Sequence, residues 1–132
     1  MKKAVITGIA GMVGSHLSDY LLENTDWEII GFLRWNDPME NLEHLFKRIN
    51  RKDRIQLFFG DLNDQSSIEE CLRQNSPDYI FHLAAQSLVR KSYLSPYETW
   101  NVNLMGSINL IESLNKIEKK CACIVVTTDK VY

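Results

Sequence analysis

At residues 7–14 the chain reads Thr7-Gly8-Ile9-Ala10-Gly11-Met12-Val13-Gly14, and this stretch decides the fold. A short apolar run over residues 3–7 precedes it, and an amphipathic run over residues 12–23 follows. The first glycine permits a tight turn, the second lets the backbone approach a pyrophosphate, and the third lets a helix pack against a strand. The start of that helix offers free N–H groups and a positive dipole end to phosphates. The stretch therefore predicts a strand, a turn that binds a dinucleotide, and a helix. Three glycines that form only a turn are the alternative.

The alternation of strand and helix continues along the chain. Strands are expected at residues 3–7, 27–33, 55–59, 78–83 and 123–127, and helices at residues 12–23, 41–49 and 66–72. A longer helix is expected before the last strand, with an apolar face made of Val102, Met105, Ile108, Leu110, Ile111 and Leu114. This order predicts an α/β fold of the Rossmann type: a doubly wound parallel sheet, of which the five N-terminal strands are present, with helices on both faces.

Composition limits the classes of protein and partner. A length of 132 residues with 45% hydrophobic content fits one domain, here residues 1–132. The formal charge of −2 is spread over mixed charges, so we expect no nucleic acid and no membrane as partner. The start of the chain is too short in apolar residues for a signal peptide, which makes the cytoplasm the expected compartment. The cysteines, Cys71, Cys121 and Cys123, lack zinc or redox spacing and are expected to be buried thiols.

Two further segments follow predicted strands: Gly60-Asp61-Leu62 and His82-Leu83-Ala84-Ala85-Gln86. Parallel strands bring their carboxyl ends to one edge, where open α/β sheets bind ligands. With the glycine pattern, these segments resemble the extended short-chain dehydrogenase/reductases. The resemblance implies an NAD(P) site in which Asp61 holds the adenine amino group and the segment from His82 passes beneath the cofactor. An ordinary turn, or small residues at a strand–helix junction, would explain either segment taken alone.

The choice between NAD and NADP depends on the end of the second strand. An acidic residue there is typical of NAD binding, because it accepts hydrogen bonds from the ribose 2′-hydroxyl. The chain instead has Arg34, whose guanidinium suits a 2′-phosphate and can stack on adenine. NADP is therefore favoured. Asp37 keeps NAD open, and a solvent-exposed arginine without a ligand is the other alternative.

Candidate catalytic residues follow the last strand. Removing water across C5 and C6 of a sugar needs a base and an acid, and Asp129-Lys130 supplies two adjacent titratable groups. The segment Thr128-Asp129-Lys130 resembles that of nucleotide-sugar 4,6-dehydratases, in which the cofactor takes a hydride from C4 and returns it to C6. By resemblance, Thr128 binds the sugar O4, Asp129 is the acid and Lys130 is the base. A polar strand end facing solvent is the alternative.

The family's Tyr-x-x-x-Lys pair is absent from the sequence. We therefore expect residues 1–132 to be an NAD(P)-binding domain truncated at its C-terminal end, without a substrate domain and inactive alone. The full-length protein is expected to be a lyase, and a homo-oligomer as is common in the family.

The substrate is expected to be a nucleotide sugar, contacted by Gln86, Ser87 and Arg90. Residues 27–61 resemble GDP-mannose 4,6-dehydratases, which convert GDP-mannose to GDP-4-keto-6-deoxymannose. Residues 84–90, 103–106 and 128–130 are closer to CDP-glucose 4,6-dehydratases. We favour GDP-mannose because the first stretch is the more distinctive. The alternatives are CDP-glucose, a nucleotide-sugar 4-epimerase and a non-catalytic dinucleotide-binding module.

Overall fold

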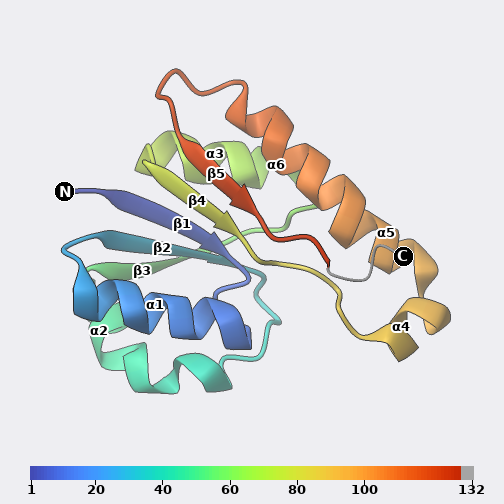
Figure 1. The fold of residues 1–132 in the computed structure, drawn as a ribbon, viewed down its shortest axis with the longest axis horizontal. Helices are drawn as coiled ribbons and strands as arrows, with labels where there is room; N and C mark the ends of the chain where they lie inside the picture. Colours follow the sequence, from blue (N-terminus) through green and yellow to red (C-terminus); the bar gives the residue numbers. More distant parts are fainter. Residues whose placement is uncertain (129–132) are drawn as a thin grey trace.

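A five-stranded parallel sheet forms the centre of the computed structural model, which describes residues 1–128 (Figure 1). The strands are β1 (Lys3–Thr7), β2 (Glu28–Leu33), β3 (Ile55–Phe59), β4 (Tyr79–His82) and β5 (Ala122–Val125), and their order in the sheet is β3-β2-β1-β4-β5. Every neighbouring pair is parallel. The predicted Rossmann-type fold is confirmed. The strand order reverses between β1 and β4, and this switch point is where such sheets bind ligands.

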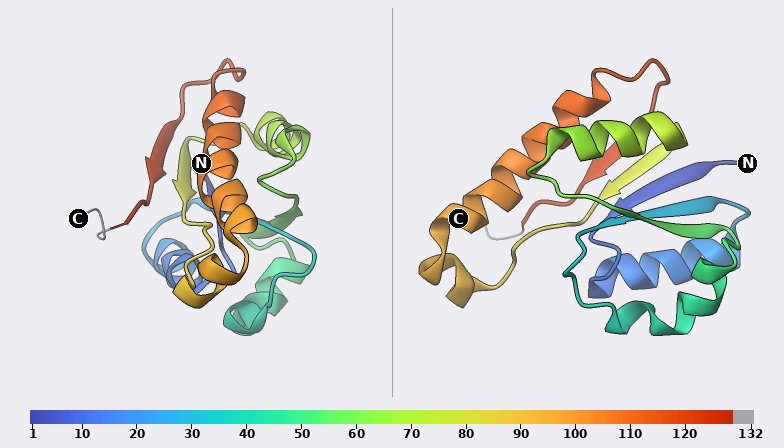
Figure 2. Two further views of the ribbon diagram at one scale, coloured as in Figure 1. Left: turned by 90° about the vertical axis from the view of Figure 1, so that its right-hand side faces the viewer. Right: turned by 180° about the vertical axis from the view of Figure 1, so that it is seen from behind.

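Helices cover both faces of the sheet. They are α1 (Met12–Asn24), the 3₁₀ helix η1 (Glu40–Leu45), α2 (Phe46–Asn50), α3 (Gln65–Asn75), α4 (Val89–Leu94), α5 (Pro96–Trp100), the π-helical turn η2 (Asn101–Met105) and α6 (Gly106–Leu114). Helices α1 and α2 lie on one face, and α3 and α6 lie on the other (Figures 1 and 2). The helix expected at 41–49 thus begins as a 3₁₀ helix, and the long last helix is divided into several parts. Among residues 1–128, no helix is both long and apolar enough to cross a membrane.

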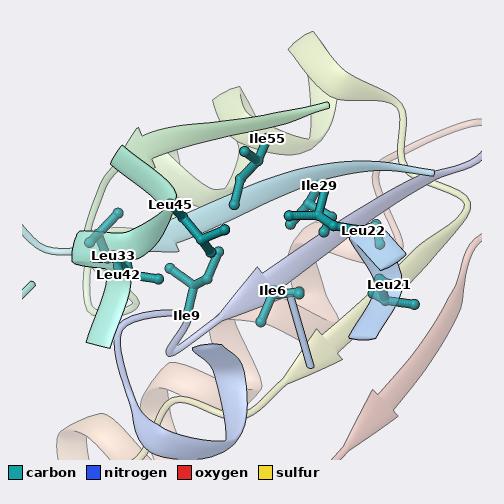
Figure 3. Packing of buried hydrophobic residues seen from close by; sticks show 10 residues of the cluster. Ile6, Ile9, Leu21, Leu22, Ile29, Leu33, Leu42, Leu45 and Ile55 are labelled. Carbon is teal, nitrogen blue, oxygen red and sulfur yellow. The ribbon is translucent and has the colours of Figure 1, made fainter. Parts of the chain in front are cut away.

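Side chains that alternate along the strands build two hydrophobic cores. Ile6 of β1 and Ile29 of β2 are buried in the core beneath α1 and η1 (Figure 3). Their neighbours Val5 and Ile30 are buried on the opposite face, against α3 and α6. A strand buried on both faces explains why these segments read as continuous apolar runs.

The apolar face predicted for the last helix is wrong in part. Leu110 is buried, but Met105, Ile108 and Ile111 are 40–48% exposed. The helix turns smaller residues toward the sheet, because Gly106 and Ser113 are buried there with Leu110. A Cβ on Gly106 would lie 3.0 Å from Leu62 Cβ, so the glycine permits a close approach.

The three cysteines are free, but only one matches the expected burial. Cys71 is 1% exposed, whereas Cys121 and Cys123 are half-buried on and beside the edge strand β5. Burial raises the pKa of the Cys71 thiol to about 12, which makes it unreactive at neutral pH.

Candidate functional site

The glycine turn between β1 and α1 lies against the loop that follows β4. Gly8 has a φ of +72°, a backbone conformation that residues with a side chain rarely adopt. A Cβ on Gly8 would lie 2.8 Å from Ala84 N, and one on Gly14 would overlap Gly8 O and lie 2.7 Å from Ile9 Cα. Gly11 is less confined, with Gly8 O at 3.2 Å from its added Cβ as the one close atom. Gly8 and Gly14 are therefore fixed by packing, while Gly11 leaves open space beside the turn.

The N-terminus of α1 presents free backbone donors at this turn. Its N-cap is Gly11, which supplies no side-chain cap. The first intrahelical bond runs from Ser15 N to Gly11 O at 3.0 Å, so the N–H groups of residues 12–14 have no helical acceptor. Met12 and Val13 are 72% and 58% exposed, which leaves this end open to solvent. Free N–H groups at the positive end of a 13-residue helix can bind an anion.

The segment after β3 places Asp61 on the same edge of the sheet. Asp61 Oδ1 accepts a bond from Asn63 N at 2.9 Å, which shapes the turn. Among residues 1–128, the second carboxylate oxygen of Asp61 has no partner. Leu62 is 7% exposed, and its carbonyl accepts a bond from Asn109 Nδ2 of α6 at 2.7 Å. The structure thus leaves one acceptor of Asp61 available to an N–H donor.

Arg34 and Asp37 form an ion pair beyond the end of β2. Arg34 Nε and Nη2 lie 3.0 and 2.9 Å from Asp37 Oδ1, and the backbone N of Arg34 donates to Asp37 Oδ2 at 2.9 Å. Trp35 stacks on Phe59 with ring centroids 4.0 Å apart, yet is 82% exposed. The pair and the open indole face form the outer border of the same edge.

A buried polar network lies beneath the glycine turn. Thr7 Oγ1 is 2.7 Å from His82 Nδ1 and accepts bonds from the backbone N of Leu83 and of Ala84 at 3.1 Å each. His82 Nε2 lies 2.9 Å from Ser107 Oγ of α6. His82 is 2% exposed, and burial lowers the pKa of its imidazole. The network joins the ends of β1 and β4 to α6.

Thr7 and Ser107 were missed by sequence reasoning. Thr7 ends an apolar strand and precedes the first glycine, where a hydroxyl is easily read as the start of the turn. Ser107 follows Asn103 by four residues, so two polar side chains on one face of an otherwise apolar helix are the signal that points to it.

The three expected substrate contacts differ in their surroundings. Gln86 uses its side-chain amide within the loop: Nε2 donates to Leu88 O and Thr99 Oγ1 at 3.1 Å each, and Oε1 accepts from Leu88 N at 2.8 Å. Ser87 and Arg90 are exposed, and among residues 1–128 their side chains make no hydrogen bond or ion pair. Gln86 thus shapes the loop, while the other two are open to a ligand. Ala85 is exposed beside them, and Leu83 and Ala84 are half-buried.

Of the expected catalytic residues, Thr128 is exposed after β5, whereas Asp129 and Lys130 lie outside the described residues. Pairing of β5 with β4 continues past the strand, because Val126 N donates to His82 O at 3.1 Å. This bond brings the segment before Thr128 to the same edge as Leu83–Ala85. Residues 1–128 contain no cluster of three His, Cys, Asp or Glu side chains suited to a metal ion.

The chain is similar to known proteins over nearly its whole length. A family model described as GDP-mannose 4,6 dehydratase matches residues 5–132. The CDP-glucose 4,6-dehydratase of Salmonella typhimurium is 32% identical over 99% of this chain and 35% of its own length. The GDP-mannose 4,6-dehydratase of Vibrio cholerae is 34% identical over 99% of this chain and 36% of its own length.

A solved structure of the UDP-glucose 4-epimerase from Thermus thermophilus, in complex with NAD, superposes with a TM-score of 0.74 at 27% identity. The match covers 91% of this chain and 36% of the epimerase. The chain therefore spans about a third of the length of the relatives it matches.

Proposed function

This chain belongs to the GDP-mannose 4,6-dehydratase family of extended short-chain dehydrogenase/reductases, and from this premise we propose that its protein removes water from a nucleotide sugar. The favoured substrate is GDP-mannose, and the product is GDP-4-keto-6-deoxymannose. Residues 1–132 form the NAD(P)-binding part, and the domain that binds the sugar nucleotide lies elsewhere in the full-length protein. The observation that carries the proposal is the glycine turn, packed against the β4 loop at the switch point of the sheet with an uncapped helix behind it.

The residues of this edge fit a dinucleotide. The N–H groups of Met12, Val13 and Gly14 would bind the pyrophosphate, and the absence of a Cβ on Gly11 leaves room for its approach. The unpaired carboxylate oxygen of Asp61 would accept a hydrogen bond from the adenine amino group. The backbone of residues 83–85 would lie beneath the cofactor, held by Thr7. When bound, the cofactor supplies hydride transfer.

NADP is the proposed cofactor, with Arg34 as the group that binds the 2′-phosphate. Arg34 Nε and Nη2 face Asp37, while Nη1 has no partner among residues 1–128 and can donate to a phosphate oxygen. Asp37 also places a carboxylate beside that phosphate, which opposes NADP. Replacing Asp37 with Asn should therefore raise the affinity for NADP relative to NAD, and replacing Arg34 with Ala should lower it. Equal effects on the two cofactors would contradict this role for the pair.

The proposed dehydration uses the residues that follow β5. Thr128 would bind the sugar O4, Asp129 would protonate the departing C6 hydroxyl and Lys130 would remove the C5 proton. A lysine base must be neutral, which requires burial or nearby positive charge to lower its pKa. This proposal is supported by the pairing of β5 with β4, which brings Val126 beside the end of β4, just before the loop assigned to the cofactor. Ser87 and Arg90 are the proposed substrate contacts, and Gln86 holds their loop.

The test is a product assay on the complete translation product of the gene. GDP-mannose, CDP-glucose and UDP-glucose are each incubated with NAD or NADP, and the products are identified by mass and NMR. We expect a 4-keto-6-deoxy sugar from GDP-mannose, lost in Asp129→Asn and Lys130→Met while cofactor binding is kept. The same product from CDP-glucose would establish the runner-up. A 4-epimer that is insensitive to both substitutions would establish an epimerase instead, and a protein that binds cofactor but turns over nothing would be a binding module.

The full-length protein is proposed to be a homo-oligomer that uses the last helix. Tyr97, Trp100, Leu104, Ile108 and Ile111 recur at helical spacing and are 40–78% exposed. The consecutive elements α5, η2 and α6, which carry them, run along one side of the molecule (Figure 2). Sedimentation of the full-length protein with Ile108→Glu should show a shift to the monomer. An unchanged oligomer would contradict a role of these exposed apolar residues in the contact between subunits.

A further inference from the structure

The hydrogens of the network beneath the glycine turn can be placed from its geometry. Thr7 Oγ1 accepts the N–H groups of Leu83 and Ala84, each at 3.1 Å. A hydroxyl oxygen has two lone pairs, and both are used. The Thr7 hydroxyl must therefore act as a donor, and His82 Nδ1 at 2.7 Å is the acceptor. Nδ1 of His82 consequently carries no hydrogen.

The rest of the network follows from this assignment. A neutral imidazole with a bare Nδ1 carries its hydrogen on Nε2, which donates to Ser107 Oγ at 2.9 Å. The Ser107 hydroxyl donates in turn to Asn103 O at 2.7 Å. Each side-chain donor from Thr7 to Ser107 has one acceptor, so the direction of these bonds follows, while the N–H of Leu83 is shared between Thr7 Oγ1 and Thr7 O, the latter at 3.3 Å.

We propose that His82 is a positioning residue of the cofactor site, which holds the Thr7 hydroxyl in the orientation that clamps the glycine turn to the β4 loop. This inference rests on the proposed NAD(P) site. His82 itself is buried and acts only through Thr7. Because the Gly8 backbone already lies against Ala84, rotation of the Thr7 hydroxyl would loosen the contact on which the phosphate turn depends. Ser107 carries the same constraint to α6.

A protonated His82 is incompatible with this arrangement. An imidazolium has a hydrogen on both ring nitrogens, so Nδ1 would face the Thr7 hydroxyl as a second donor. Burial is the cause of the lowered pKa of His82, and among residues 1–128 no charged side chain contributes to it. The neighbours that bond to the ring, Thr7 of β1 and Ser107 of α6, are both uncharged hydroxyls. The site is thus built for the neutral ring.

The test combines a spectroscopic and a binding measurement on the chain. The ¹⁵N spectrum of the His82 ring at pH 7, without cofactor, should show a bare Nδ1 and a protonated Nε2. Thr7→Val should abolish that single tautomer, whereas Thr7→Ser should keep it. Calorimetry with NAD and NADP should show at least about tenfold weaker binding for Thr7→Val, which removes three hydrogen bonds of the network, and for His82→Phe, which removes two. Thr7→Ser and the exposed control His44→Asn should bind like the unaltered chain.

Each outcome decides one question. A ring with its hydrogen on Nδ1, or a His82→Phe chain that folds and binds normally, would overturn the positioning role alone. If His82→Phe does not fold, His82→Gln and Thr7→Val replace it, and normal binding by both has the same meaning. Failure of the unaltered chain to bind NAD or NADP overturns the proposed cofactor function, and the positioning role with it. The tautomer is read without cofactor, so the hydrogen-bond assignment is tested separately.

Discussion

Alanine substitutions at two glycines of one turn should separate cofactor binding from folding. A Cβ at Gly11 meets one close atom, Gly8 O at 3.2 Å, and the local φ of −76° and ψ of 173° suit alanine. The gain from a less flexible unfolded chain, about 0.4–1 kcal/mol, roughly offsets the loss at the N-cap. We expect Gly11→Ala to change the free energy of unfolding by less than about 1 kcal/mol.

Gly14→Ala should behave in the opposite way. Its Cβ would overlap Gly8 O and lie 2.7 Å from Ile9 Cα, whereas carbon atoms pack at about 3.5–4.0 Å. The helix would have to move away from the turn by roughly 1 Å, and overpacking of this kind costs about 1–3 kcal/mol or more. The clash is with backbone atoms, which have no rotamer to change. We therefore expect a large shift of the urea midpoint.

The assays are urea unfolding followed by circular dichroism and calorimetric titration with NAD and NADP. Gly11→Ala should keep the midpoint but bind at least about tenfold more weakly, because the methyl group would block the approach of the pyrophosphate. Gly14→Ala, in contrast, should lower the urea midpoint. If Gly11→Ala bound the cofactor as tightly as the unaltered chain, the assignment of this turn to the pyrophosphate would be refuted.

Three further predictions concern stability. Arg54→Met should lower the free energy of unfolding by about 1–3 kcal/mol, because the guanidinium donates to two carbonyl oxygens at the end of α1, at 2.6 and 2.7 Å. An unchanged urea midpoint would contradict this role of Arg54 as a C-terminal cap of α1. Ser76→Gly should raise the free energy of unfolding by about 0.5–1 kcal/mol, because Ser76 ends α3 with a φ of +44° that glycine adopts without strain. A loss of stability would contradict this expectation. The pKa of buried His82 is lowered from 6.5, so the unfolded chain binds the proton first as pH falls. Stability should thus be complete above about pH 7.5, decrease as pH falls through 6.5 and level off below the folded pKa; His82→Gln should reduce this pH dependence in unfolding curves.

The fold could be predicted from the sequence because the central strands β1 and β2 are buried on both faces. Runs such as Val5-Ile6 and Ile29-Ile30 place one side chain in each core, and such runs end at glycine or polar residues where the sheet ends. The glycine spacing added the position of the first turn. These signals are local in the sequence, so pattern and spacing were sufficient to predict the parallel sheet and its helices.

The interior of the site was harder to predict from the sequence, because it depends on contacts between distant segments. The bond between Thr7 and residues 83–84 joins positions more than seventy apart in the chain, and no local pattern predicts it. Likewise, the inner face of α6 carries Gly106 and Ser113, which hydrophobic spacing assigns to the outside. Close backbone approach and a satisfied hydroxyl, rather than apolar area, decided which side of this helix is buried.

Binding of NAD(P) at the carboxyl edge of the sheet can be tested by a titration followed by ¹H–¹⁵N NMR. NADP is added to the labelled chain, and the shift changes are mapped onto the structure. We expect saturable changes concentrated at Gly8–Gly14, Asp61–Leu62 and Leu83–Ala85, with residues at the opposite edge unaffected. Saturable changes centred elsewhere, or none at millimolar NADP and NAD, would contradict it.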